Sequence, residues 1–254
     1  MMKVSSGKPD YSPLDDITPY MDKPVKFKHV KSTVLDECNK FSNSERRRYY
    51  YAPDGSHYPS VTTVLHHTAP VKDGLKKWRE RVGNSVADHI MQQSSKTGSL
   101  THALIERYLN NTKINMPQPL MAYGHLKNLE PYLFYIDNIK ATEVPLVDTT
   151  LGCAGTVDCI ADFDGTLSII DFKTMRSLKE NDWMHDYYVQ AAAYGIMWHA
   201  MTGEHIDQSV ILCTAEDGKS KAVLKDNKSY EHEFRERLGR YRAEIGDYDD
   251  DANR

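Results

Sequence analysis

Two aspartates and a lysine lie close together near the middle of the sequence. Asp171 and Lys173 end a Leu/Ile-rich segment, and in an extended strand both side chains project from the same side. Asp158 lies in the preceding alternating segment, and an Asp164-Gly165 turn folds it back beside Asp171. Carboxylates bind Mg²⁺ or Mn²⁺, the ion activates water, and a lysine stabilises charge that develops on a phosphate. The sequence therefore predicts metal-assisted phosphodiester hydrolysis.

The Asp-x-Lys motif alone also fits an ordinary ion pair at the end of a surface hairpin. Further motifs in a fixed order favour the catalytic interpretation. They are Gly98-Ser99-Leu100-Thr101-His102, Gly155-Thr156-Val157-Asp158, Asp171-Phe172-Lys173 and Gln190-Ala191-Ala192-Ala193-Tyr194. Together they resemble the RecB-like branch of the PD-(D/E)XK nuclease superfamily, and within it the mitochondrial genome maintenance exonucleases and their phage and bacterial relatives. The resemblance covers roughly residues 46 to 203, and Val157 stands where many members have proline.

This resemblance implies a role for each matched position. The implied catalytic residues are Asp158, Asp171, Lys173 and Glu143. The implied ligands of Mg²⁺ or Mn²⁺ are His102, Asp158, Asp171 and the backbone carbonyl of Phe172. The implied DNA-binding residues are Gln190, Tyr194, Ser60, Thr62, Lys76, Trp78 and Arg79. Each has a structural alternative: a core histidine, a strand-edge acid, a tyrosine packed on the sheet, or a solvated basic helix face. Glu106, one turn after His102, either supports the site or is an exposed helix acid.

Hydrophobic periodicity predicts the elements that position these residues. A hairpin around Asp54-Gly55 precedes a helix capped by Ser60. Further helices are expected over 72–93, after Gly98, and over 120–139. Three antiparallel strands follow between Glu143 and Lys173, then a helix over 185–201, strands over 208–214 and 220–224, and a helix over 230–245. The order matches the α-β-β-β-α-β core of restriction-endonuclease-like folds. The expected fold is α/β, with a mixed central sheet flanked by helices and an N-terminal helical elaboration.

The chain has 254 residues, 40% of them hydrophobic and 27% charged, which is typical of one soluble globular domain. We expect an arm of uncertain order over 1–45, a single nuclease domain over 46–246 and an acidic tail over 247–254. Within the domain, 46–139 form the hairpin and helical part, 140–225 the catalytic sheet and helix, and 226–246 the C-terminal helix. The four cysteines lack C-x-x-C spacing, which argues against structural zinc and a disulfide framework.

Residues 244–254 carry a net charge of −4, which equals that of the whole chain, so the remainder is neutral. DNA is therefore expected to bind a local stripe of basic residues, because the protein as a whole is not basic. No apolar run is long enough to span a bilayer, and the N-terminus has neither a signal core nor transit-peptide character. We therefore expect a monomer in the cytoplasm of a bacterium or phage-infected host, without membrane association and with unknown protein partners.

The expected function is a DNA exonuclease that prefers single-stranded DNA with free ends, or duplex ends, in recombination, repair or replication. Two alternatives remain open. One is an endonuclease or double-strand-resecting nuclease of the same fold. The other is a non-catalytic DNA-binding protein that keeps the fold, although none of the acids or the lysine of the motifs is lost.

Overall fold

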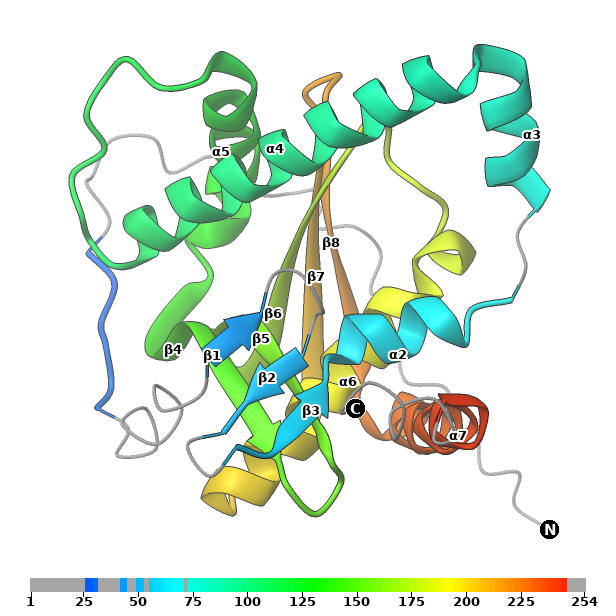
Figure 1. The fold of residues 1–254 in the computed structure, drawn as a ribbon. Coiled ribbons are helices and arrows are strands. Elements are labelled where there is room, and N and C mark those ends of the chain that lie inside the picture. The colour runs from blue at the N-terminus through cyan, green and yellow to red at the C-terminus, as the bar shows by residue number, and fades with distance from the viewer. Residues whose placement is uncertain (1–25, 32–41, 45–48, 53–54, 71–72, 246–254) are drawn as a thin grey trace, which may run out of the picture.

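A five-stranded sheet forms the centre of the molecule (Figure 1). The computed structural model describes residues 26–31, 42–44, 49–52, 55–70 and 73–245. The strands are β4 (Ile136–Asp148), β5 (Cys153–Phe163), β6 (Thr166–Met175), β7 (Gln208–Ala215) and β8 (Ser220–Asp226), and they neighbour one another in that order. All neighbours are antiparallel except β6 and β7, which are parallel. The crossover that a parallel pair requires is supplied by η1 (Asn181–Met184) and α6 (His185–Thr202). The α/β fold with a mixed sheet is the predicted one.

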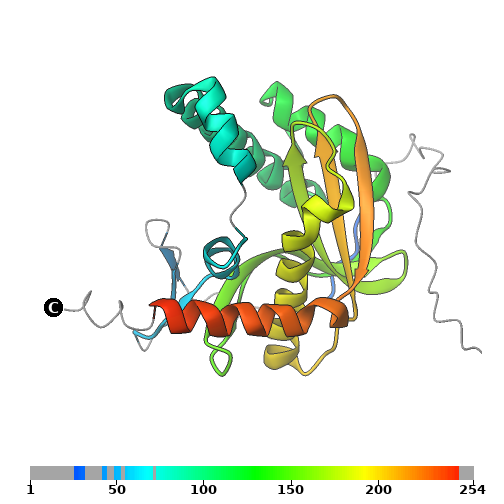
Figure 2. The same cartoon turned by 90° about the vertical axis from the view of Figure 1, so that its right-hand side faces the viewer.

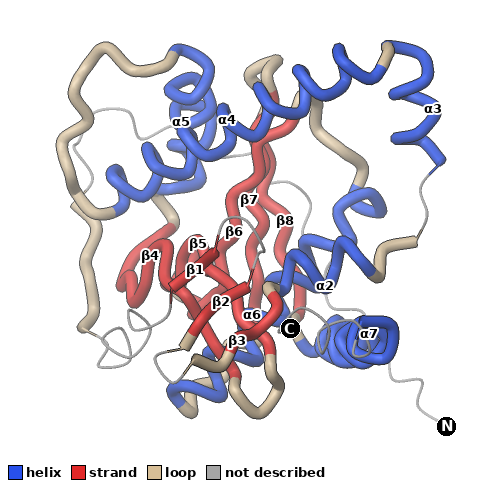
Figure 3. The backbone as a smooth tube through the Cα atoms, viewed as in Figure 1, coloured by secondary structure: helices blue, strands red, loops and turns tan. Residues whose placement is uncertain are grey.

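Helices cover both faces of this sheet (Figure 3). On one face lies α6, with α7 (Lys228–Ile245) and α2 (Val61–His67) packed against it (Figure 2). The segment of α6 from Tyr188 to Trp198 is buried without interruption, because the sheet covers one side of the helix and the other helices cover the rest. The other face carries α5 (Leu120–Leu133) and the C-terminal half of α4 (Asn84–Leu109), which close a second apolar core.

Two helices extend past the sheet. α3 (Asp73–Val82) and the N-terminal half of α4 lie away from it in Figure 2. The prediction of a helix over 72–93 and another after Gly98 was wrong, because the break falls at Gly83, whose φ is +86°, and α4 continues through Gly98. Gly98 lies inside α4 where the helix packs closely against β6, and its missing side chain allows this close packing. A Cβ atom on Gly98 would lie 3.3 Å from Oγ1 of Thr174.

The first strand of the sheet begins earlier than expected. The predicted helix over 120–139 ends at Leu133, and β4 starts at Ile136 rather than at Glu143. Ile136 follows Leu133 at a spacing of three residues, which suits the buried stripe of a helix. A short apolar segment can equally begin a buried strand, so periodicity alone does not distinguish a helix from a strand here. Ile136 is buried and pairs with Phe163 across the hairpin.

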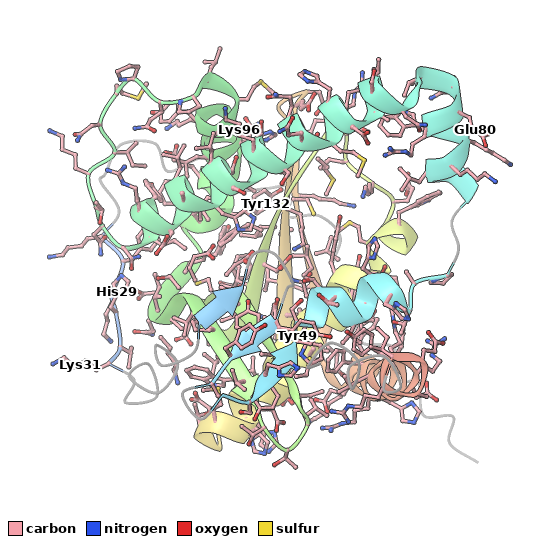
Figure 4. The ribbon with its side chains drawn as sticks, viewed as in Figure 1. His29, Lys31, Tyr49, Glu80, Lys96 and Tyr132 are labelled. Carbon is pink, nitrogen blue, oxygen red and sulfur yellow. The ribbon has the colours of Figure 1, made fainter. Side chains whose placement is uncertain are left out.

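The N-terminal part forms a segment beside the central sheet and a small sheet of its own. Residues 26–31 lie beside β4, where His29 (labelled in Figure 4) bridges to Ile139 and Phe27 is buried, so this piece of the expected arm is anchored. Strands β1 (Ser42–Ser44), β2 (Tyr49–Tyr51) and β3 (His57–Pro59) form a separate antiparallel sheet that includes the predicted hairpin. The expectations for 1–25, 32–41 and the acidic tail fall outside the described residues.

Three of the cysteines are buried as free thiols, and their positions are Cys153, Cys159 and Cys213. Cys38 lies outside the described residues. No helix in the described part of the chain combines the length and the apolar character needed to cross a bilayer.

Candidate active site

The candidate site lies where β5 and β6 stop pairing. Their antiparallel register runs from Phe163 and Thr166 to Cys159 and Ile170. Beyond that point the backbone N–H of Phe172 donates to Oδ2 of Asp158 over 2.8 Å, in place of a strand-to-strand bond. The two strands therefore separate where their aspartates occur, and one carboxylate inserts between them.

The predicted ion pair on β6 is formed and buried. Nζ of Lys173 lies 2.7 Å from Oδ2 of Asp171 and 2.9 Å from Oδ1, and Asp171 is only 1% exposed. The same ammonium donates to Oε1 of Gln190 over 3.4 Å, and the amide of Gln190 donates to the hydroxyl of Tyr194 over 3.1 Å. The predicted Gln-x-x-x-Tyr pair thus positions Lys173. The side chains of Gln190 and Tyr194 are buried. Their contact with DNA stays a prediction.

A second group of side chains meets across the gap between α4, β4 and β5. His102, Glu143 and Asp158 each offer one ligand atom, and these atoms all lie within 4.8 Å of one another. Nδ1 of His102 is 3.4 Å from Oε1 of Glu143 and 3.6 Å from Oδ2 of Asp158. Its Nε2 donates to the carbonyl oxygen of Phe172 over 2.9 Å. The structure therefore brings together the histidine, the strand-edge acid and the first aspartate that the sequence selected.

Glu143 has a backbone conformation that is uncommon for its residue type. Its φ is +51°, and it lies between the cross-strand pairs Thr142–Cys159 and Val144–Val157. A non-glycine residue in the left-handed region is held there by its surroundings, and such residues cluster at functional sites.

Burial and mutual charge shift the pKa values of this group. Burial alone would lower the pKa of His102, but the neighbouring carboxylates of Asp158 and Glu143 outweigh it and raise that pKa to about 9. Burial raises the pKa of Asp171 to about 6 against the opposing effect of Lys173, and it raises the pKa of Asp158 as well. Burial would also lower the pKa of Lys173, yet Asp171 and Asp158 raise it above its usual value. A buried set of acids of this kind favours a bound cation.

Residues 125–252 match the family model described as the PD-(D/E)XK nuclease superfamily, which is half of the chain. The chain belongs to the PD-(D/E)XK nuclease superfamily. The matched segment contains Glu143, Asp158, Asp171 and Lys173, whereas His102 lies upstream of it.

Among curated proteins, the chain is similar to those called mitochondrial genome maintenance exonuclease 1. The human protein is 26% identical over 129 residues, covering 48% of this chain and 38% of that one. The Xenopus tropicalis protein is 27% identical over 148 residues, covering 54% and 42%. The chain therefore aligns with about two fifths of the length of these relatives. A crystal structure of a putative exonuclease from Eubacterium rectale is also similar, with a TM-score of 0.41, 15% identity and coverage of 59% of this chain and 68% of that one.

PD-(D/E)XK nucleases use divalent metals, and the residues at this site fit such an ion. Carboxylate and carbonyl oxygens suit Mg²⁺ and Mn²⁺, and the imidazole of His102 adds a nitrogen donor that transition metals accept. The predicted ligand Asp171 is not part of the 4.8 Å group, and its carboxylate pairs with Lys173. A pocket of about 380 Å³ opens beside the donors, lined by Gly98, Ser99, His102, Ala103, Glu106 and Glu143. Glu106 therefore lines the same pocket as His102 and Glu143.

The other predicted DNA-binding residues lie apart from this centre. Ser60 is buried and caps α2, where its Oγ accepts from the backbone N–H of Thr63 over 3.1 Å and lies 3.0 Å from the hydroxyl of Thr62. Lys76, Trp78 and Arg79 lie on α3, the helix that extends past the sheet, and Arg79 pairs with Asp88 of α4. Their roles in DNA binding stay predictions.

One residue near the PD-(D/E)XK centre was missed by the sequence reasoning. Nζ of Lys173 lies 4.9 Å from the centroid of the ring of Tyr187. Tyr187 precedes Gln190 by three positions on α6, so both lie on one face of that helix. Its spacing could have indicated this position, because Tyr187 lies about one helical turn before Gln190.

Proposed function

We propose that this protein is a divalent-metal-dependent deoxyribonuclease that degrades DNA from free ends and prefers single strands. The observation that carries the proposal is the meeting of His102, Glu143 and Asp158 beside the buried pair of Asp171 and Lys173. The names of the relatives, which are called exonucleases, support the choice of exonuclease over endonuclease. A role in recombination, repair or replication is part of the same proposal.

The metal is proposed to be Mg²⁺ or Mn²⁺, held by His102, Asp158, Asp171 and the carbonyl oxygen of Phe172. When bound there, it would supply an activated water and neutralise negative charge on the phosphate. Glu143 lines the pocket next to these ligands and is proposed to accept the proton of the attacking water. Its position opposite Asp158, fixed by the unusual backbone conformation, supports that role.

Lys173 is proposed to stabilise the charge that develops on the phosphate. Its raised pKa keeps the ammonium protonated at neutral pH, so it acts as a cation rather than as a general base. Asp171 and Gln190 fix that ammonium from two directions, and Tyr194 fixes Gln190 in turn. A preorganised point charge of this kind suits phosphate oxygens.

The preference for free ends is proposed from the position of α3 and α4. The helix α4, which carries His102, passes the sheet and joins α3 at the end that lies away from the sheet (Figures 1 and 2). Lys76, Trp78 and Arg79 on α3 would contact a DNA strand that passes between α3 and the sheet. Ser60 and Thr62, at the start of α2, would contact the same DNA strand. Gln190 and Tyr194 would act on the strand through Lys173.

The test uses end-labelled DNA, single-stranded and duplex, linear and circular, with Mg²⁺, Mn²⁺ or EDTA. We expect rapid release of short products from linear single strands, slower action on duplexes, none on circles and none in EDTA. The variants Lys173→Ala and Asp171→Asn should each lose about a hundredfold or more in rate, whereas Lys219→Ala, an exposed lysine beside the β7–β8 turn, should not. Cleavage of circles would instead indicate an endonuclease, and DNA binding without cleavage would indicate a non-catalytic protein.

A further inference from the structure

The ring of Tyr187 contacts two ammonium groups. Nζ of Lys173 lies 4.9 Å from the ring centroid and Nζ of Lys179 lies 5.6 Å from it. Nζ of Lys179 also donates to the Tyr187 hydroxyl over 3.4 Å. The two ammonium groups are therefore no farther apart than the sum of the two centroid distances, which is 10.5 Å. An exposed lysine of the connection after β6 is thus held beside the lysine of the active site.

The backbone at Lys179 is fixed to the sheet. Nζ of Lys221 donates to the carbonyl oxygen of Lys179 over 2.6 Å. Lys221 lies on β8 opposite Cys213, and Cys213 lies opposite Lys173 on β6, so these three residues form one row across the sheet. Directly opposed residues share a face, which places Lys221 on the same face as Lys173. The connection that carries Lys179 is therefore anchored to the row of the catalytic lysine.

The charges of the two lysines on the ring are balanced differently. The charge of Lys173 is offset by Asp171 at 2.7 Å. Among the side chains that the structure describes, which exclude those of residues 181 and 182, no carboxylate forms an ion pair with Nζ of Lys179, and the Lys179 side chain is exposed. Two cations near one ring repel each other, and an anion between or beside them would remove that cost. The arrangement suits a ligand that carries negative charges in a row.

We propose that Lys179 binds a backbone phosphate of the DNA strand close to the phosphate that is cleaved, and that Tyr187 sets the distance between the two contacts. This inference rests on the proposed nuclease function. The 3.4 Å axial rise per nucleotide of duplex DNA is a lower limit on the spacing of phosphates along one strand, so a span of up to 10.5 Å corresponds to at most about three nucleotides. The subsite recognises charge rather than sequence, because a lysine on a phosphate carries no base information.

The test measures how the dissociation constant of a short fluorescent oligothymidylate depends on NaCl concentration, in EDTA so that no cleavage occurs. For Lys179→Gln we expect weaker binding and a salt slope smaller in magnitude by about 0.7 to 1, the value for one lost phosphate contact. Lys179→Arg should keep the wild-type slope, since it keeps the charge. With Mg²⁺, Lys179→Gln should raise KM and leave kcat near the wild-type value, because the contact is made equally before and during reaction.

Lys225→Gln is the matched control. Lys225 also lies on β8 and its ammonium contacts a tyrosine of α6, at 5.1 Å from the ring centroid of Tyr188, but it pairs with Ser209, four residues away from the row of Lys173. We expect this variant to keep the wild-type slope. If Lys179→Gln has the same slope as Lys225→Gln while the wild type cleaves DNA, the subsite is wrong and the nuclease function stands. A wild type that neither binds nor cleaves DNA overturns both.

Discussion

Gly155 of β5 lies in contact with the ring of Tyr194 of α6. A Cβ atom at Gly155 would lie 2.7 Å from Cε1 of Tyr194, which is closer than nonbonded carbon atoms approach. Tyr194 accepts from Gln190, and Gln190 accepts from Lys173, so the position of the tyrosine ring is linked to that of the Lys173 ammonium. The glycine of the Gly-x-x-Asp motif is therefore linked to Lys173 through Tyr194 and Gln190.

Gly155→Ala should weaken both the fold and the activity. The added methyl group must displace a fully buried ring, and overpacking of this kind costs about 1–3 kcal/mol in free energy of unfolding. A shift of the ring would be passed through Gln190 to Lys173, and a displacement of about 1 Å at a catalytic group costs about a hundredfold in rate. Urea unfolding and the rate of release of labelled nucleotides measure the two effects.

Gly239→Ala is the control for this change. Gly239 lies in α7 and a Cβ atom there would meet nothing within 4 Å, so the alanine should raise the stability by about 1 kcal/mol through helix propensity and leave the rate unchanged. A Gly155→Ala protein with wild-type stability and rate would show that the ring of Tyr194 moves without consequence.

Metal binding should release a proton from His102. In the metal-free fold its Nε2 donates to the carbonyl of Phe172 and its Nδ1 faces Glu143, which suits the doubly protonated ring. Its pKa is raised to about 9, so the proton stabilises the fold fully below pH 6.5, and that contribution is lost as pH rises through 9. A metal needs the neutral imidazole, so the apparent affinity for Mn²⁺ should rise between pH 7 and 9.

Calorimetric titration of Mn²⁺ at pH 8 in two buffers of different ionisation enthalpy counts the released protons. We expect about one for the wild type, since Asp171, with a pKa of about 6, is already ionised. His102→Ala should release almost none. Equal heats in the two buffers for the wild type would mean that His102 is neutral before the metal binds, or does not bind it.

The sequence predicted the β5–β6 hairpin because the signals for it are local. The alternation in β5 and β6 and the turn at Asp164-Gly165 lie within a few residues, and both turn residues have the positive φ that a tight hairpin requires. The ion pair of Asp171 and Lys173 followed directly from strand geometry. The α/β class and the position of α6 were predicted for the same reason.

Features that depend on packing between distant elements were not predicted. Gly83 and Gly98 look alike in sequence, but only the second lies against a strand, and only the first adopts a positive φ. The left-handed backbone of Glu143 occurs inside β4, between the cross-strand pairs Thr142–Cys159 and Val144–Val157, and no local sequence pattern predicts it. The contact of Lys179 with Tyr187 joins a connecting loop to a helix, so spacing alone could not show it.

Arg237 should be the main polar contributor to the packing of the helices α2, α6 and α7. The side chain is 2% exposed and donates to Asp186 over 2.7 Å, to the carbonyl of Leu65 over 2.6 Å and to the hydroxyl of Thr68 over 2.9 Å. Arg237→Met leaves buried acceptors without donors, so we expect a loss of about 3 kcal/mol in free energy of unfolding.

Arg235→Ala, an exposed change two residues earlier in α7, should stay within about 0.5 kcal/mol of the wild type in chemical denaturation. The folded Arg237→Met protein should cleave DNA at the wild-type rate at low temperature, because the hydrogen bonds that Arg237 makes in the described part of the chain go to Thr68, Asp186, Glu233 and Leu65 and not to the proposed catalytic residues. A stable Arg237→Met protein with low activity would contradict this separation of stability from catalysis.

Asp158→Asn should separate metal binding from the stability of the metal-free fold. The amide oxygen can still accept from the backbone N–H of Phe172, and the change removes a carboxylate whose pKa burial has raised. The metal-free variant should therefore melt no lower than the wild type. Mn²⁺ at about a hundredfold excess over its dissociation constant should stabilise the wild type by about 2.7 kcal/mol. The variant should gain far less and lose its nuclease activity.

Asp162→Asn is the matched control for this prediction. Asp162 lies on the same strand four residues later, where it accepts from the amide of Asn138 over 2.7 Å and does not join the ligand group. This variant should show the full Mn²⁺ shift in thermal unfolding and full activity. An undiminished shift in Asp158→Asn would mean that the ion binds without this carboxylate, and a lost shift in Asp162→Asn would mean that the ion depends on the integrity of β5 rather than on a particular ligand.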